Sequence, residues 1–166
     1  MHFKNDSVAD GNQNYTISVT PSSSSADTTG YKTLTAQTVS VNNTDNDSPG
    51  FTLGTISGNT SEAGGSATFT VKLNSQPNGN VLLNLASSNT SEGTISSSSL
   101  TFTTTNWNAT QTVTVTGVND SVADGNQSYT ISVTPSSSSA DTTGYTTLTA
   151  QTVSVSNTDN DSPGFT

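Results

Sequence analysis

An internal repeat constrains the fold of this chain more than any other feature. Residues 5–52 recur as residues 119–166, at an offset of 114 residues. Near-identity over this length indicates tandem duplication of a module of 114 residues, a typical size for a single domain. The two copies differ at only three pairs of positions: Asn14 against Ser128, Lys32 against Thr146, and Asn42 against Ser156.

The repeat divides the chain into one complete module and pieces of its neighbours. Residues 5–48 are expected to form the carboxy-terminal, two-strand tail of a preceding module, and residues 49–161 a complete module. Residues 162–166 begin the next one. Residues 1–4 do not match the corresponding residues of the second copy and are interpreted as a cloning remnant or a divergent start of the repeat.

Hydrophobic periodicity decides between a folded module and a disordered tract. Only 30 of the 166 residues are Leu, Ile, Val or Phe, and 62 are Ser or Thr, a composition close to that of disordered chains. Yet apolar and polar residues alternate with the period of two that is typical of strands with one buried face. The alternation covers residues 67–73, 81–85, 113–116 and 129–133, and a shorter run lies at 100–102.

Clusters of Gly, Pro, Asn and Ser, such as residues 76–79, separate these runs, and no apolar stripe of helical period occurs. We therefore predict an all-β fold, an immunoglobulin-like antiparallel β-sandwich of about seven strands in each repeat. In the last strand the parity of the apolar positions changes between Leu148 and Val153. This change predicts a bulge or a switch of sheet near Gln151 and Thr152.

Composition and charge exclude several classes of function. No apolar run approaches the roughly 18 residues of a membrane helix, so membrane insertion is not expected. With a net charge of −9, three lysines and no arginine, nucleic-acid binding is not expected either. The lack of cysteine excludes disulfides and thiolate zinc sites. The one histidine is His2, and no nucleophile, base and acid can be assembled, so we predict no catalytic residue and no enzyme.

Most acidic residues of the complete module gather in three segments that are expected to be loops. Carboxylates spaced two or four residues apart among Asn and Gly can supply oxygen ligands to Ca²⁺, which takes about six to eight of them. No lysine is near in sequence to neutralise them, although Asp and Asn are also common as solvated turn residues. The candidate ligands are Glu62, Asp120, Asp124, Asp159 and Asp161.

Three strings of the module resemble the Calx-β repeat: GGSATFTVKL after Ser61-Glu62, DGNQSYTISV, and VSVSNTDND. The family pattern has a glutamate before an early strand, an acidic loop before a later strand and a terminal acidic triplet. The resemblance covers nearly all of the module and extends more loosely to giant bacterial surface proteins built from such arrays. It implies an immunoglobulin-like sandwich whose acidic loops bind calcium at one end.

Carried over position by position, the resemblance implies calcium ligands in both copies. In the complete module it adds Glu92, in a loop where the family often places another acidic ligand. The sequence departs from the family in its sparser acidic loop before residue 127 and at Asn160, where Asp is common, which implies fewer ions or weaker binding. In the tail the matching residues are Asp6, Asp10, Asp45 and Asp47.

These observations predict an extracellular or cell-surface module of a long array, structural or adhesive, and stiffened by Ca²⁺ at the module ends. Its expected partners are neighbouring repeats or other copies of itself. Residues 159–165 also resemble the acidic, calcium-binding linker of cadherins. One alternative is a self-assembling filament or matrix subunit. Another is a glycan- or ice-binding module that uses Trp107 or the row Thr112, Thr114, Thr116.

The tail supplies only the last two strands of a module, so its apolar stripe has no earlier strands to cover it. We expect this hairpin to be frayed or docked on another copy by strand addition or swapping. Trp107 is expected at the rim of the core, and Asp27 and Asp141 are expected to cap a hairpin loop. The stripe consists of Tyr15, Ile17, Val19, Val39 and Val41.

Overall fold

The computed structural model describes residues 5–24, 26 and 28–165, and it divides into two compact units. The first unit comprises Met1–Asp6 and Asp10–Asp47, and the second comprises Ser7–Ala9 and Ser48–Thr166. Ser7–Ala9 belong to the second unit, where the carbonyl of Ser7 accepts a hydrogen bond of 2.6 Å from the backbone N–H of Gln76.

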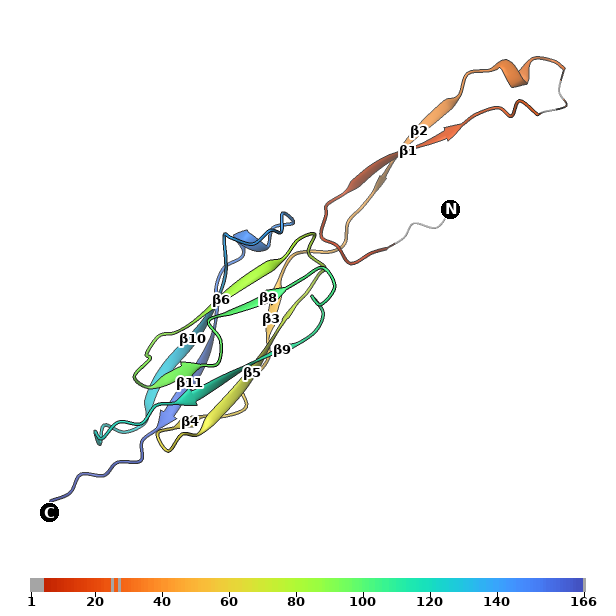
Figure 1. Cartoon of the computed structure of the whole chain (residues 1–166). Helices are drawn as coiled ribbons and strands as arrows, with labels where there is room; N and C mark the ends of the chain where they lie inside the picture. Colours follow the sequence, from red (N-terminus) through yellow and green to blue (C-terminus); the bar gives the residue numbers. More distant parts are fainter. Residues whose placement is uncertain (1–4, 25, 27, 166) are drawn as a thin grey trace. The chain divides into compact units, whose positions relative to one another are not determined.

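The first unit is a two-stranded antiparallel hairpin. Strand β1 (Gln13–Val19) pairs with β2 (Gln37–Asn43), and a short 3-10 helix, η1 (Tyr31–Thr33), lies in the connection between them (Figure 1). In the described part of this unit, β1 and β2 pair only with each other. The hairpin therefore has one sheet and no second layer.

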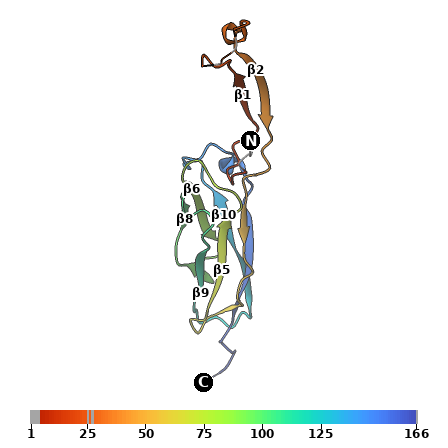
Figure 2. The same cartoon turned by 90° about the vertical axis from the view of Figure 1, so that its right-hand side faces the viewer.

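The second unit is a β-sandwich of two sheets, whose strands run along the length of this unit in Figure 2. The five-stranded sheet has the order β4-β11-β10-β6-β8, and the four-stranded sheet has the order β3-β5-β9-β7. All pairings are antiparallel except that of β4 with β11. The elements are β3 (Phe51–Leu53), β4 (Thr60–Ser61), β5 (Ser66–Leu73), β6 (Val81–Ser87), β7 (Gly93–Ile95), β8 (Ser99–Phe102), β9 (Gln111–Gly117), β10 (Gln127–Pro135), η2 (Tyr145–Thr147) and β11 (Gln151–Thr158).

The all-β sandwich predicted from the sequence is confirmed. The long strands β5, β6, β9 and β10 lie where the alternation of apolar residues predicts them, and one side of each is buried. The sheets hold more strands than the seven or so expected, because β3, β4 and β7 have only two or three residues each. A run that short carries no recognisable alternation.

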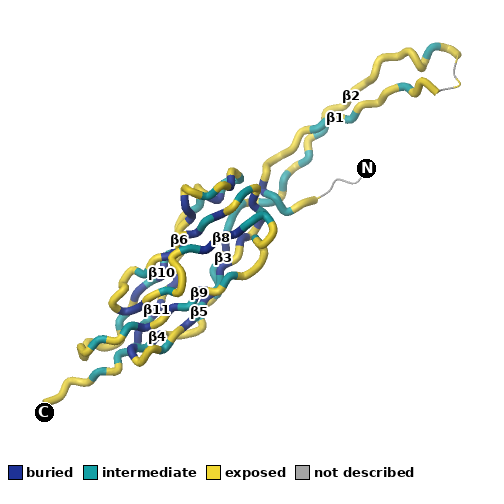
Figure 3. The backbone as a smooth tube through the Cα atoms, viewed as in Figure 1, coloured by how far each residue is buried: buried dark blue, intermediate teal, exposed yellow. Residues whose placement is uncertain are grey.

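The core of the sandwich lies between the two sheets. Phe69, Val71 and Leu73 of the four-stranded sheet face inward, as do Ile131 and Val133 of the five-stranded sheet. In Figure 3, buried stretches of the second unit alternate with less buried ones along the chain. The small number of apolar residues suffices because each strand buries only one face.

The predicted bulge or switch of sheet near Gln151 and Thr152 is wrong. Strand β11 begins at Gln151, and Leu148 lies before it, directly after the 3-10 helix η2. Leu148 still packs against the core from this irregular segment. The change of parity thus marks the passage from a helical turn into a strand, not an irregularity within one continuous strand.

A buried carboxylate and a buried phenol fix the η2 segment. Asp141 accepts hydrogen bonds from the backbone N–H groups of Asn78 and Thr143, which confirms its predicted capping role; Asp27 lies outside the described residues. The hydroxyl of Tyr145 donates to the carbonyl of Ser75 over 2.6 Å. Both side chains lie at the end of the sandwich opposite the one at which β11 terminates.

Candidate metal centre

Four loops of the module meet at the end of the sandwich where β11 terminates, close to the carboxy terminus in Figure 1. They are the β4–β5 connection, the β6–β7 connection, the β9–β10 connection and the segment that follows β11. Antiparallel pairing brings the ends of these strands to one edge although they are distant in sequence. Every carboxylate that the sequence proposes as a ligand in the complete module lies on one of these loops.

The first carboxylate group consists of Glu62, Asp159 and Asp161. One ligand oxygen from each lies within 4.8 Å of the other two. Glu62 is only 3% exposed, and its Oε2 accepts a hydrogen bond of 3.1 Å from the backbone N–H of Asn160. The group therefore joins the β4–β5 connection to the segment after the last strand.

Asp159 is held by backbone donors on both sides. Its Oδ2 accepts from the N–H of Gly125 and its Oδ1 from the N–H of Asp161, each over 2.7 Å. Gly125 has a φ of 75°, a left-handed conformation that favours glycine and orients its N–H. These two bonds lower the pKa of Asp159 despite partial desolvation, and a hydrogen bond from Glu62 lowers it further.

Glu62 is the carboxyl whose ionisation the fold opposes. The hydrogen bond from Asn160 lowers its pKa, but desolvation and the negative charges of Asp159, Asp120 and Asp161 together outweigh that bond. The pKa of Glu62 is raised as a result. A cation at this position would supply the positive charge that the protein itself does not.

The second carboxylate group consists of Glu92, Asp120 and Asp124, again with ligand oxygens within 4.8 Å of one another. Glu92 is 6% exposed, and its Oε2 accepts a hydrogen bond of 3.3 Å from the side-chain amide of Asn157. Asp120 Oδ1 accepts from the N–H of Val122 over 2.7 Å. This group joins the β6–β7 connection to the β9–β10 connection.

The donor set fits a hard divalent cation. Both groups are made of carboxylate oxygens, the ligands that Ca²⁺ prefers. Asp161 Oδ2 is buried and has no hydrogen-bond partner among the described residues, a costly state for a charged oxygen without a cation. Lys72 is the one lysine in the second unit, and it lies near the far end of β5 from Glu62. Side chains of the described module therefore offer no neutralising partner at these groups.

The structure thus brings together all six predicted ligands of the complete module and divides them into two groups of three. The sequence pattern did not show this division, nor the part played by Asn157, which is 2% exposed and donates a hydrogen bond to Glu92. The sequence does indicate that Asn157 is buried, because it lies two residues after Val155 and four after Val153, on the face of the strand that points inward. A polar residue at such a position has a buried partner.

The predicted ligands of the tail lie together in the first unit. Asp6, Asp10, Asp45 and Asp47 line one small acidic pocket with neighbouring Asn, Gln and Gly residues. The two backbone hydrogen bonds to Asp159 have counterparts there. Asp45 accepts from the N–H groups of Gly11 and Asp47 over 2.7 and 2.8 Å. No group of three ligand atoms within 4.8 Å is found here among residues 5–24, 26 and 28–47.

Two other predicted features lie away from these groups. Trp107 is half-buried and packs against the core, so the prediction of a core-rim aromatic is confirmed. Thr112 and Thr114 face outward on β9, opposite Thr70 and Thr68 of β5. The glycan- or ice-binding alternative remains a prediction.

No family model and no curated protein matches this sequence. Among solved structures, the chain is similar to SSP-19, an MSP-domain protein like family member of Caenorhabditis elegans, at 18% identity and a TM-score of 0.42, over 63% of this chain and 97% of that one. It is similar to the periplasmic chaperone SfaE at 10% identity and a TM-score of 0.46, over 69% of this chain and 59% of that one.

The chain is also similar to domains 4 and 5 of the S-layer protein SbsC at 21% identity and a TM-score of 0.36, covering 75% of this chain and 62% of that one. With these identities and TM-scores below 0.5, none of the three similarities carries functional information for this chain. The described residues contain no helix long and apolar enough to cross a membrane.

Proposed function

We propose that this chain is a calcium-stabilised structural module of an extracellular or cell-surface repeat array, without enzymatic activity. The observation that carries the proposal is the pair of carboxylate groups at one end of the sandwich, with Glu62 and Glu92 almost fully buried. Burial of a carboxylate without a cationic partner is unfavourable, and a bound cation removes that cost. The Calx-β resemblance of the sequence independently suggests calcium at this end.

Calcium would act here as a cross-link between loops. Glu62, Asp159 and Asp161 would hold one ion, and Glu92, Asp120 and Asp124 a second. The ions would supply positive charge at an end of the module that carries six carboxylates, and they would tie four loops from both sheets together. The thin apolar core gives such a contribution particular weight in the stability of the module.

Thermal unfolding in calcium and in chelator tests the proposal. A ligand that binds only the folded state at 100 times its Kd adds about 2.7 kcal/mol to the free energy of unfolding. For a domain of this size, we expect calcium to raise the melting temperature of the second unit by about 10 °C. Calorimetric titration should show binding to the same preparation.

Two matched variants assign the effect to the groups. Asp161→Asn should remove the part of the calcium-dependent shift in melting temperature that the first group contributes, because Asp161 supplies that group's buried oxygen without a partner. Asp47→Asn changes the corresponding residue in the tail and should leave the shift of the second unit intact. An equal melting temperature in calcium and chelator, with no titration heat, would disprove the metal proposal.

A further inference from the structure

We propose that the hairpin β1–β2 is a docking surface for the leading strands of another copy of this module, the strands equivalent to β3–β9. The second copy of the hairpin sequence, β10–β11, shows what covers such a face. In the sandwich, β10 pairs with β6, β11 pairs with β4, and their inward side chains pack into the core. The first unit has the same sequence without those strands.

The same side chains differ sharply in exposure between the two hairpins. Val133 is fully buried and Val153 is 8% exposed, whereas their counterparts Val19 and Val39 are 64% and 59% exposed. Tyr145 is fully buried, while Tyr31 is 67% exposed. Figure 3 shows β1–β2 largely in the colours of exposed and intermediate residues. An apolar face of this kind on a soluble chain marks an interaction site.

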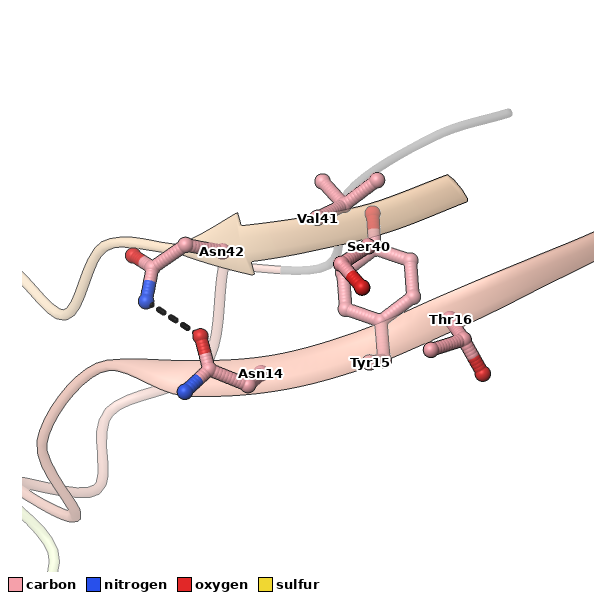
Figure 4. A pocket seen from close by; sticks show the side chains of 6 residues that line it. All are labelled: Asn14, Tyr15, Thr16, Ser40, Val41 and Asn42. Carbon is pink, nitrogen blue, oxygen red and sulfur yellow. Dashed lines mark hydrogen bonds between the residues drawn. The ribbon is translucent and has the colours of Figure 1, made fainter. Parts of the chain in front are cut away.

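None of the three differences between the two hairpin sequences lies on the face that β10–β11 buries in the core. Asn14 and Asn42 lie opposite each other, and their side chains are joined by a hydrogen bond of 2.7 Å (Figure 4). Their counterparts Ser128 and Ser156 also lie opposite each other, so two of the three differences form one cross-strand pair. The third, Lys32, is exposed, as is its counterpart. The hairpin therefore retains every side chain that its copy buries.

Strand pairing would add to apolar burial, and it fixes the register. In the module, Ile131 lies opposite Ser87 and Val133 opposite Leu85. The corresponding edge of β1 forms no ladder in the described part of the first unit. Docking should therefore place Ile17 and Val19 opposite the Ser87 and Leu85 of the incoming copy, which is strand addition at a free edge.

Docking would also complete the acidic pocket of the tail, a consequence that rests on the proposed function. The tail contains the counterparts of the four aspartates of the module but not those of Glu62 and Glu92. Both glutamates lie in connections of the leading strands. The incoming strands would therefore supply the third carboxylate of each group.

The test is a chain in which residues 49–118 are joined ahead of Asn5 and everything after Asn5 is unchanged. Amide hydrogen exchange is followed at 13–19 and 37–43, and at 127–133 and 151–157 as the internal reference. The Asn and Ser differences distinguish the peptides of the two hairpins. We expect exchange at 13–19 and 37–43 to slow at least about 100-fold relative to the original chain, toward the reference rate.

Matched variants show whether slower amide exchange at 13–19 and 37–43 is due to docking. Ile17→Asp should abolish the new protection in the extended chain but leave the melting of the second unit unchanged in the original chain. Ile131→Asp should instead unfold the second unit in both chains. Protection of 13–19 that survives Ile17→Asp would overturn the proposal.

The proposal would equally be overturned if the original chain, as a homodimer by light scattering, protected 13–19 while 127–133 kept its full protection, since the occupant would then be a second hairpin and not the leading strands of another copy. Unchanged exchange in the extended chain, with calcium and with chelator, would also overturn docking, whatever the metal does. Protection that is the same in both conditions would support docking and count against the proposed metal role.

Discussion

Asn157 holds the second carboxylate group through its neutral side-chain amide. Its amide donates to Glu92 and to the carbonyl of Val118, and its Oδ1 accepts from the hydroxyl of Thr60, two residues before Glu62. A neutral amide can orient a buried carboxylate without adding to the negative charge around it. The amide reaches Glu92 only at Oε2, so this bond leaves Oε1 of that carboxylate for other ligands.

Glu62 should make the stability of the metal-free module depend on pH. Its pKa is raised in the fold, so folding is favoured while Glu62 is protonated. The free energy of unfolding in chelator should fall as pH rises from the ordinary value of 4.5 through the raised pKa. Asp159, whose pKa is lowered, acts in the opposite sense below its ordinary value of 3.8. Urea unfolding at a series of pH values measures both windows.

Glu62→Gln provides the control for this dependence. The variant cannot ionise at position 62, so its stability in chelator should stay flat where that of the wild type declines. It should also bind calcium more weakly, because one carboxylate is lost. Parallel pH profiles for the variant and the wild type would contradict the assignment to Glu62.

At the scale of single elements, one phenol makes a measurable contribution to the η2 segment. Tyr145 donates to the carbonyl of Ser75 and accepts from its N–H over 3.2 Å, in a fully buried position. Tyr145→Phe leaves these buried backbone groups of Ser75 without that partner and should lower the free energy of unfolding by about 1–3 kcal/mol. Chemical denaturation of the second unit measures the change. Tyr31→Phe makes the same substitution in the tail and should have no effect on that transition.

The strands that the sequence predicted are those in which one buried face imposes alternation over several residues, as in β5 and β10. Sequence alternation could not predict β4, which has only two residues and is defined by its pairing with β11. It also gave no warning of η2, because Tyr145 and Leu148 are apolar at positions that suit a strand as well as a turn. Tertiary hydrogen bonds to Ser75 and to Asp141 determine that segment.

The candidate ligands of the module could be predicted because carboxylates are few and are concentrated in loops. Their division into two groups could not, since it depends on which loops are adjacent in space. Glu92 follows β6, and Asp120 follows β9, and only the register of the two sheets brings them together. The spacing of aspartates within one loop holds no such information.

At the scale of the whole molecule, the net charge of −9 should act through ionic strength. In chelator, mutual repulsion of the carboxylates opposes folding, and salt screens it over a Debye length of about 10 Å at 0.1 M. Raising NaCl should therefore increase the melting temperature of the second unit in chelator. In calcium the increase should be much smaller, because bound ions already neutralise the groups. Equal salt dependence in both conditions would count against this account.

The parallel pairing of β4 with β11 has a mechanical consequence. Tension along an array would enter a module near β3 and leave it after β11. It would pull the parallel neighbours β4 and β11 in opposite directions along their length. The hydrogen bonds between β4 and β11, together with any ion shared by Glu62, Asp159 and Asp161, would then bear the force simultaneously and would not break one after another. A module built this way would yield to force at a rate that dissolved calcium controls, so the tensile strength of the array would follow the ionic composition of its surroundings.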